Sequence, residues 1–225
     1  MVLDIHYVFL MLPKVISALP LTLYVLLFSY IGSLVLGSTI AFIRIKRIPI
    51  LFLLTSISLS FFRSIPNILN IMIIYYGLPL FAERIGFFIR WDKSTFCIVS
   101  LVLVHGHYIA EYMRPAWESV QQSMHDAAKS IGMTNWQRTR RIILPLAMPV
   151  ALPMLVNAAI DMLKDTSVLF IIGLGDIMGK MNTLVALDYG VKKLEIYLAG
   201  GMIYAAIITS FTWLAKVIER RLKLS

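Results

Sequence analysis

Charged residues inside apolar segments are the best candidates for chemistry in this chain. Asp161, Lys164 and Asp165 are three and four positions apart, which puts two carboxylates and one ammonium on one helix face. Arg63 interrupts an earlier apolar region and could bind a carboxylate bidentately. Together these four residues could bind a solute that carries both a negative and a positive group, so they are a candidate substrate path. The alternative is a set of structural ion pairs that order the helices.

Other familiar site patterns are missing from the sequence. His105 and His107 are two positions apart, about 200° around a helix, so they cannot share a metal-ligand face. The sequence has no nucleophile elbow, no metalloprotease helix motif and no phosphate-cradling glycine loop. We therefore expect no catalytic residue, no metal site and no ATP bound by this chain.

The composition is that of an integral membrane protein. Of 225 residues, 59% are hydrophobic and 15% are charged, against about 25% charged in soluble domains. The formal net charge of +9 could indicate nucleic acid in a soluble chain. Here the basic residues flank apolar runs without interleaved aromatics, so we interpret them as topology signals and expect no nucleic-acid partner.

The apolar runs predict about five transmembrane helices, an all-α polytopic fold in a single domain spanning residues 1–225. The surest span has 29 positions without a charge, more than the roughly 20 that cross a bilayer. Prolines in the second and fourth regions suggest helices that line a path rather than face lipid. The predicted spans are about residues 15–43, 50–79, 94–112, 146–174 and 196–215.

The distribution of Lys and Arg predicts the orientation. Twelve of them fall at 44–47, 113–145 and 216–225, and seven fall on the other side of the predicted spans. By the positive-inside rule, the first side is cytoplasmic. With five spans, the N-terminus is then outside and the C-terminus inside, which places the loop at about 113–145 in the cytoplasm.

That loop has its own helix signals. Pro115 and Glu118 suit a first helical turn and Gly132 suits a left-handed stop, which predicts one helix over about 115–131. Thr134 and Gln137 predict a capping box that begins a second, short helix before Pro145 disturbs it. From this pattern alone, a plain surface loop between two spans is an equal alternative.

The spacing of seven loop residues resembles the permease subunits of bacterial ATP-binding cassette importers. Their cytoplasmic loop reads EAA, three residues, G, nine residues, I, one residue, LP. The one departure is aspartate in place of glutamate, which keeps the charge and shortens its reach. The corresponding residues are Asp126, Ala127, Ala128, Gly132, Ile142, Leu144 and Pro145.

In that family the loop is a coupling helix that docks into a groove on the ATPase subunit. The resemblance therefore implies that the small side chains of Ala127 and Ala128 touch the ATPase. Arg138, with Arg140 and Arg141, would then offer charge near the rim of the contact.

Further segments resemble the polar amino-acid branch of these importers from about residue 20 onward. The match at Arg63 is imperfect, because this branch more often has Gly-Thr where the chain has Ser64 and Ile65. The matching segments are Thr22–Leu23, Phe62–Pro66, Tyr75–Pro79 and Lys164–Ser167.

The resemblance implies a permease subunit in the bacterial cytoplasmic membrane that imports polar amino acids. Its implied partners are a pair of ATP-binding subunits that carry ATP and Mg, a second permease subunit, an external solute-binding protein, the amino acid and the lipid bilayer. The alternatives are an importer for another small solute, a membrane enzyme and a non-transporting scaffold. Identifying the proteins that co-purify with the chain would separate them.

Overall fold

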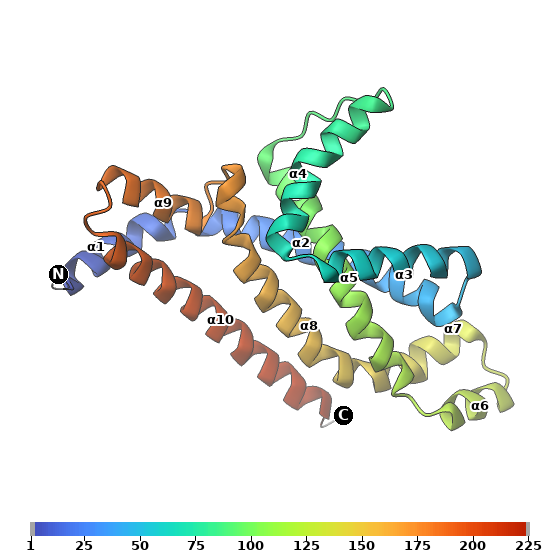
Figure 1. The fold of residues 1–225 in the computed structure, drawn as a ribbon. Coiled ribbons are helices and arrows are strands. Elements are labelled where there is room, and N and C mark those ends of the chain that lie inside the picture. The colour runs from blue at the N-terminus through green and yellow to red at the C-terminus, as the bar shows by residue number, and fades with distance from the viewer. Residues whose placement is uncertain (1–2, 224–225) are drawn as a thin grey trace.

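The computed structural model describes residues 3–223, and within that range the chain forms helices and no strands (Figure 1). This confirms the predicted all-α fold. A π-helical turn lies at Thr139–Ile143 and a 3-10 turn at Leu169–Ile172. The α-helices are α1 (Ile5–Ile16), α2 (Leu19–Lys46), α3 (Pro49–Ser64), α4 (Asn67–Arg84), α5 (Lys93–Glu118), α6 (Gln122–Ser130), α7 (Asn135–Arg138), α8 (Leu144–Thr166), α9 (Ile177–Leu187) and α10 (Lys193–Lys223).

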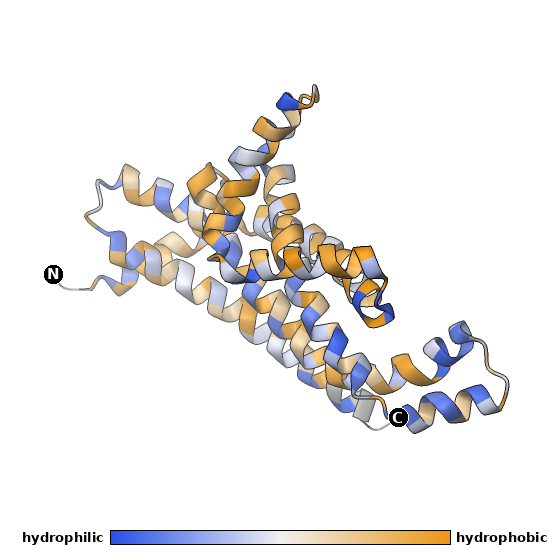
Figure 2. Cartoon of the chain, turned by 45° about the vertical axis from the view of Figure 1, so that its right-hand side comes forward, coloured by the Kyte–Doolittle hydropathy of each residue, from blue (hydrophilic) through white to orange (hydrophobic). Residues whose placement is uncertain are grey.

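Four helical segments in the described range are long and apolar enough to cross a membrane, namely α2, α5, α7 running into α8, and α10. The pair α3 and α4 adds a fifth span if it is counted as one bent unit. Apolar residues dominate these helices, while polar residues gather on α6 and the neighbouring turns (Figure 2). The prediction of about five spans is confirmed. Among the basic residues used to predict orientation, the side chains of Arg221 and Lys223 lie outside the described part.

The second predicted span is not one straight helix. α3 and α4 meet at an angle of 115°, and the break lies at Pro66, which interrupts the apolar region predicted over 50–79. Pro66 has no N–H to continue a helix, and it forces Ile65 into extended backbone, with φ −109° and ψ 137°. The Asn70 side chain then donates to the carbonyl oxygens of Phe62 and Ile65, at 2.8 and 3.1 Å.

Two other boundaries also differ from the prediction. The run over 15–43 is broken at Ser17–Ala18, because α1 ends there and Pro20 lies in the first turn of α2. The fourth span ends at Thr166 instead of about 174, and the chain then turns into α9. Asp176 begins α9 by accepting a hydrogen bond from the backbone N–H of Gly179, at 3.0 Å.

Helix α5 lies at the centre of the bundle and packs against α2, α3, α4 and α8 (Figure 1). Glycines let α2 and α5 approach closely. A Cβ atom at Gly37 would lie 2.6 Å from a methyl carbon of Ile109, and one at Gly106 would lie 2.7 Å from a methyl carbon of Leu36. Because such contacts are too short for real Cβ atoms, these glycines hold α2 against the helix that carries most of the polar side chains described below.

Candidate functional site

A polar cavity of about 280 Å³ lies between α5 and α8, at the first residue of α4. Seven of its eight lining side chains carry a polar group. The bend after Pro66 matters here, because it brings the beginning of α4 to the cavity wall. The lining residues are Asn67, His105, Tyr108, Tyr112, Ala158, Asp161, Lys164 and Asp165.

Three of the four predicted substrate-path residues meet in this cavity. The Lys164 ammonium lies 3.1 Å from a carboxylate oxygen of Asp161, and the two side chains are 59% and 57% exposed. Asp165 is held differently, since one carboxylate oxygen accepts from the Asn67 amide at 2.6 Å and lies 3.0 Å from Nε2 of His105. Asp161 and Lys164 are therefore available to a solute, while Asp165 ties α8 to α4 and α5.

Sequence reasoning missed the α5 wall of the cavity. His105 is buried, and the Tyr108 hydroxyl donates to the Asn67 side-chain oxygen at 3.4 Å. A signal was present, because residues 105, 108 and 112 are three and four positions apart and so share one helix face. Asn67 could not be found this way, since only the bend at Pro66 brings it near α8.

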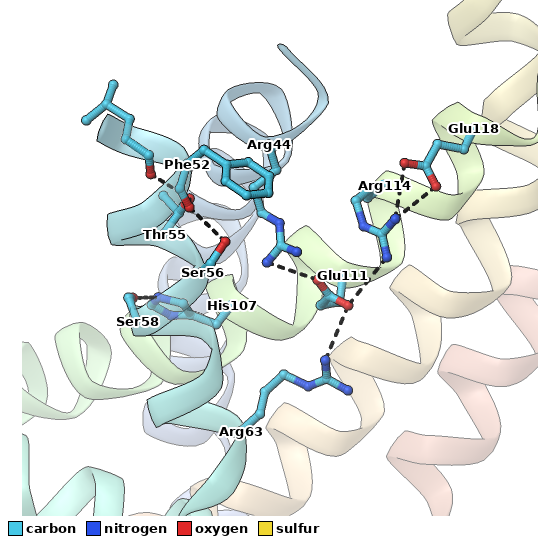
Figure 3. A network of polar contacts seen from close by, with 11 residues as sticks. Arg44, Phe52, Thr55, Ser56, Ser58, Arg63, His107, Glu111, Arg114 and Glu118 are labelled. Carbon is cyan, nitrogen blue, oxygen red and sulfur yellow. Dashed lines mark hydrogen bonds and ion pairs between the residues drawn. The ribbon is translucent and has the colours of Figure 1, made fainter. Parts of the chain in front are cut away.

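The fourth predicted residue, Arg63, does not line the cavity. Its guanidinium lies 3.2 Å from Glu111, which Arg44 also approaches to 3.3 Å and Arg114 to 4.0 Å (Figure 3). Arg114 reaches onward to Glu118 at 2.9 Å. The Glu111 carboxylate on α5 thus forms ion pairs with guanidiniums from the ends of α2 and α3 and from its own helix. Arg63 and Glu111, which the sequence places within apolar regions, are therefore paired, as the cost of an isolated charge in hydrocarbon requires.

The second histidine, His107, holds α3 against α5. Its Nε2 atom contacts the Ser58 hydroxyl (Figure 3). Its Nδ1 lies 2.5 Å from the Leu103 carbonyl oxygen, and its ring stacks on Phe62 with centroids 4.4 Å apart. His105 and His107 therefore have separate sets of neighbours. This is the separation expected from their spacing.

The second candidate region is the helix pair α6–α7, and its first helix differs from the prediction. The expected helix over 115–131 is wrong, because Pro115 lies in the last turns of α5 and the chain breaks at Ser119–Gln121. The Ser119 hydroxyl donates to the Ala116 carbonyl oxygen at 2.7 Å and so helps to end α5. A proline near a helix end is compatible with the beginning or with the last turn of a helix. Here α5 continues through Pro115 to Glu118, so the proline lies in its last turn.

The end of α6 and the beginning of α7 follow the prediction. Gly132 has φ +76°, the left-handed conformation expected of the stop. Thr134 and Gln137 form the full capping box, with bonds of 3.0 and 3.3 Å. Pro145 lacks an N–H, and just before it the Leu144 N–H bonds to the Thr139 carbonyl oxygen in the π-helical turn. The chain is therefore helix, hinge, helix, running on into α8.

The predicted coupling residues have unequal access to a partner. Ala127 is exposed, whereas Ala128 is 2% exposed and is the only buried residue of α6, the helix that packs on α7 and the following turn. Asp126 is occupied within α6, where it accepts from Gln122 at 3.1 Å and lies 3.6 Å from Lys129. The Ala127 side chain is therefore accessible from outside the helix pair, whereas Ala128 packs within it.

The outer surface of the helix pair is apolar and basic. Large apolar side chains of Met124, Ile131 and Trp136 are exposed. A groove of about 490 Å³ beside them is lined by Trp136, Gln137, Arg140 and Arg141. Burial, and then the charge of Arg138, lower the pKa of His125, which favours the neutral imidazole and leaves the arginines as the main positive charge of this surface. Such a surface suits an acidic protein partner.

Arg138 and the last residues of the loop motif, Ile142, Leu144 and Pro145, form part of α7 and of its junction with α8. The Arg138 guanidinium donates to the Asn135 side chain at 3.0 Å. Ile142 lies within the π-helical turn, and Leu144 and Pro145 begin α8. α5 and α8 thus flank both the helix pair and the polar cavity.

The fold and these two regions together define a helical membrane transport protein. The chain belongs to the family of binding-protein-dependent transport system inner membrane components, whose family model matches residues 33–224. The resemblance seen in the loop is therefore confirmed.

Characterised relatives cover nearly the whole chain. It is 36% identical over 212 residues to the L-cystine transport system permease protein TcyL of Bacillus subtilis. The aligned region covers 94% of this chain and 88% of TcyL. The chain is 29% identical over 213 residues to the glutamine transport system permease protein GlnP of Escherichia coli, with 95% and 94% covered.

Solved structures agree. A crystal structure of an amino acid ABC transporter with histidines matches with a TM-score of 0.83 at 27% identity, covering 98% of this chain and all of that one. The MetNI methionine ABC transporter matches in fold, with a TM-score of 0.74 at 18% identity, covering 93% of this chain and 96% of that one.

Proposed function

We propose that this chain is the membrane-spanning permease subunit of an ATP-binding cassette importer for polar amino acids. One observation carries the proposal. α5 and α8, which frame the polar cavity, are also the helices that lead into and out of the exposed pair α6–α7. A partner that moves the helix pair therefore moves both walls of the cavity.

The partner at the helix pair is an ATP-binding subunit. Small Ala127, exposed Trp136 and the arginine-lined groove fit a docking surface, and the partner supplies ATP and Mg. The full importer contains two such subunits, this permease with a second copy or homologue, and an external solute-binding protein. The whole chain acts as one transmembrane domain in the cytoplasmic membrane, with its N-terminus outside.

The cavity recognises the part that all α-amino acids share. Relatives are named for cystine, arginine and glutamine, which differ in their side chains. Each has an α-carboxylate, which the Lys164 ammonium can bind, and an α-ammonium, which the Asp161 carboxylate can bind. In the free chain these two groups bind each other at 3.1 Å, so a zwitterion replaces one ion pair with two.

Uptake competition in proteoliposomes tests this assignment. The complete importer should take up a labelled amino acid, and unlabelled arginine, lysine, glutamine and glutamate should compete to different degrees. Because a hydrogen bond to a charged group contributes roughly 1.5–3 kcal/mol, Asp161→Asn should weaken uptake about tenfold or more. The loss should be similar for all four competitors, because each carries the α-ammonium that Asp161 binds.

Glu83→Gln is the matched control, because it removes an exposed carboxylate of α4 away from the cavity. It should leave uptake and ranking unchanged. If Asp161→Asn keeps both the rate and the ranking and alters only thermal stability, the pair with Lys164 is structural and the substrate assignment fails.

A further inference from the structure

An apolar groove shares no lining residue with the polar cavity. It has a volume of about 230 Å³ and runs between the ends of α2, α5 and α8 that are nearest the helix pair. Its walls are built mainly from small or apolar side chains, including Ser38, Ala41, Phe42, Met113, Ala147 and Ala151.

The groove has the depth of one membrane leaflet. Along α2 it extends from Ser38 to Lys46, eight steps of the helix, which is about 12 Å at the rise of an α-helix. Half of a hydrocarbon core of about 30 Å is close to that length. The groove begins at the level of Lys46 and Trp117, residues of the kinds that mark a membrane–water interface.

The mouth of the groove is cationic. Ile45 and Trp117 are shared with a neighbouring polar groove of about 500 Å³, which Arg44 and Arg47 also line. In the part of the chain that the structure describes, neither Lys46 nor Arg47 has an ion-pair partner within 4.0 Å, whereas Arg44 is held by Glu111.

Lys46 lies along the groove wall, because its ammonium is 6.0 Å from the centre of the Phe42 ring. The acidic side chain that the structure places in the lining of the two grooves is Glu118, and Arg114 already binds it at 2.9 Å. Within the described residues, Lys46 and Arg47 therefore lack an acidic partner at the mouth of the apolar groove.

We propose that this groove binds one anionic phospholipid of the cytoplasmic leaflet. Its acyl chain lies between α2, α5 and α8, and its phosphate lies between Lys46 and Arg47. Basic pockets between transmembrane helices on the cytoplasmic side bind anionic headgroups in this way. Since Trp117 and Leu144 line the groove at either side of the α6–α7 insert, the lipid would brace the base of the helix pair. The binding does not depend on the proposed substrate.

Native mass spectrometry of the complete importer tests the proposal. The complex is stripped of lipid in detergent and titrated with phosphatidylglycerol or with phosphatidylcholine. Phosphatidylglycerol should bind with saturation, and phosphatidylcholine should bind more weakly. Since one Lys near a membrane surface contributes about 1 kcal/mol of attraction, Lys46→Glu should weaken phosphatidylglycerol binding by about fivefold or more. Met148→Trp should block the groove itself, because Met148 is a half-exposed lining residue.

The matched control is Lys216→Glu, an equal charge change on an exposed residue of α10 outside both grooves. It should bind phosphatidylglycerol as the parent does. Equal binding of both lipids, or unchanged binding in Lys46→Glu and Met148→Trp, would overturn the proposal. So would finding that another subunit of the assembled complex crosslinks to position 148 and fills the groove.

Discussion

At the scale of single residues, Glu111 is the carboxylate on which the most side chains converge. It faces Arg44, Arg63 and Arg114, so Glu111→Gln removes the carboxylate that the structure places beside Arg44 and Arg63, while Arg114 keeps Glu118. We expect this change to destabilise the protein by about 2 kcal/mol, the range for a hydrogen bond to a charged group. The apparent melting temperature in detergent measures the effect.

Glu118→Gln is the comparison, since it removes one exposed pair with Arg114. Such pairs contribute roughly 0–1 kcal/mol, so its melting temperature should stay near that of the parent. Equal shifts in the two variants would show that Glu111 does not organise the cluster.

Gly132 tests the hinge between α6 and α7. Its φ of +76° costs a β-branched residue about 1–2 kcal/mol, although no atom lies within 4 Å of where a Cβ would be. Gly132→Val should therefore insert and assemble, yet lower the amount of solute transported for each ATP hydrolysed. Transport and hydrolysis are measured together in proteoliposomes.

Gly86→Val provides the control, because Gly86 has φ +84° and open space around it but lies after α4. Gly86→Val should destabilise the protein by a similar amount but leave the amount of solute transported for each ATP hydrolysed unchanged. Normal coupling in a properly inserted Gly132→Val complex would contradict the role of the hinge.

At the scale of elements, the bend between α3 and α4 depends on Asn70. Asn70→Leu removes the donor that satisfies the carbonyl oxygens of Phe62 and Ile65, at a cost of about 1–3 kcal/mol. We expect the bend to loosen. Spin labels at the exposed positions Ile57 and Leu80 should then show a broader distance distribution.

The matched change is Asn182→Leu in α9, which removes a side-chain bond to the Met178 carbonyl oxygen away from the bend. It should leave the distance between the two labels unchanged. A narrow, unshifted distribution in Asn70→Leu would mean that Pro66 alone sets the angle.

Sequence patterns found elements well where one physical signal dominated. The charge-free run over 15–43 and the capping box at Thr134 both correspond to helices in the structure. The patterns failed where the same residues are compatible with two different local structures. Pro115 fits a helix start as well as a last turn, and the break at Ser17–Ala18 leaves an apolar run unchanged in composition.

The candidate site was predictable only in part. The spacing of Asp161, Lys164 and Asp165 placed them on one face, and they do line one cavity. Which of them would be free depended on neighbours from other helices. Asp165 contacts Asn67 of α4 and His105 of α5, and the spacing of residues within α8 cannot predict contacts with other helices.

At the scale of the whole molecule, the orientation in the membrane can be checked with single cysteines. The chain has one native cysteine, Cys97, which is buried. Tyr189→Cys, in the exposed turn before α10, should react with a membrane-impermeant thiol reagent in intact cells. Arg47→Cys, at the end of α2, should react only after permeabilisation. The reverse result would invert the topology that we propose.

The central claim is that the helix pair α6–α7 contacts an ATP-binding subunit and couples its ATP hydrolysis to transport. One crosslinking measurement tests this contact most directly. A cysteine at Ala127 is compared with one at Tyr189, in the assembled importer with its partners. The claim predicts a crosslink from position 127 to the ATP-binding subunit and none from position 189. No crosslink from position 127, in a complex that contains the subunit and hydrolyses ATP, would contradict it.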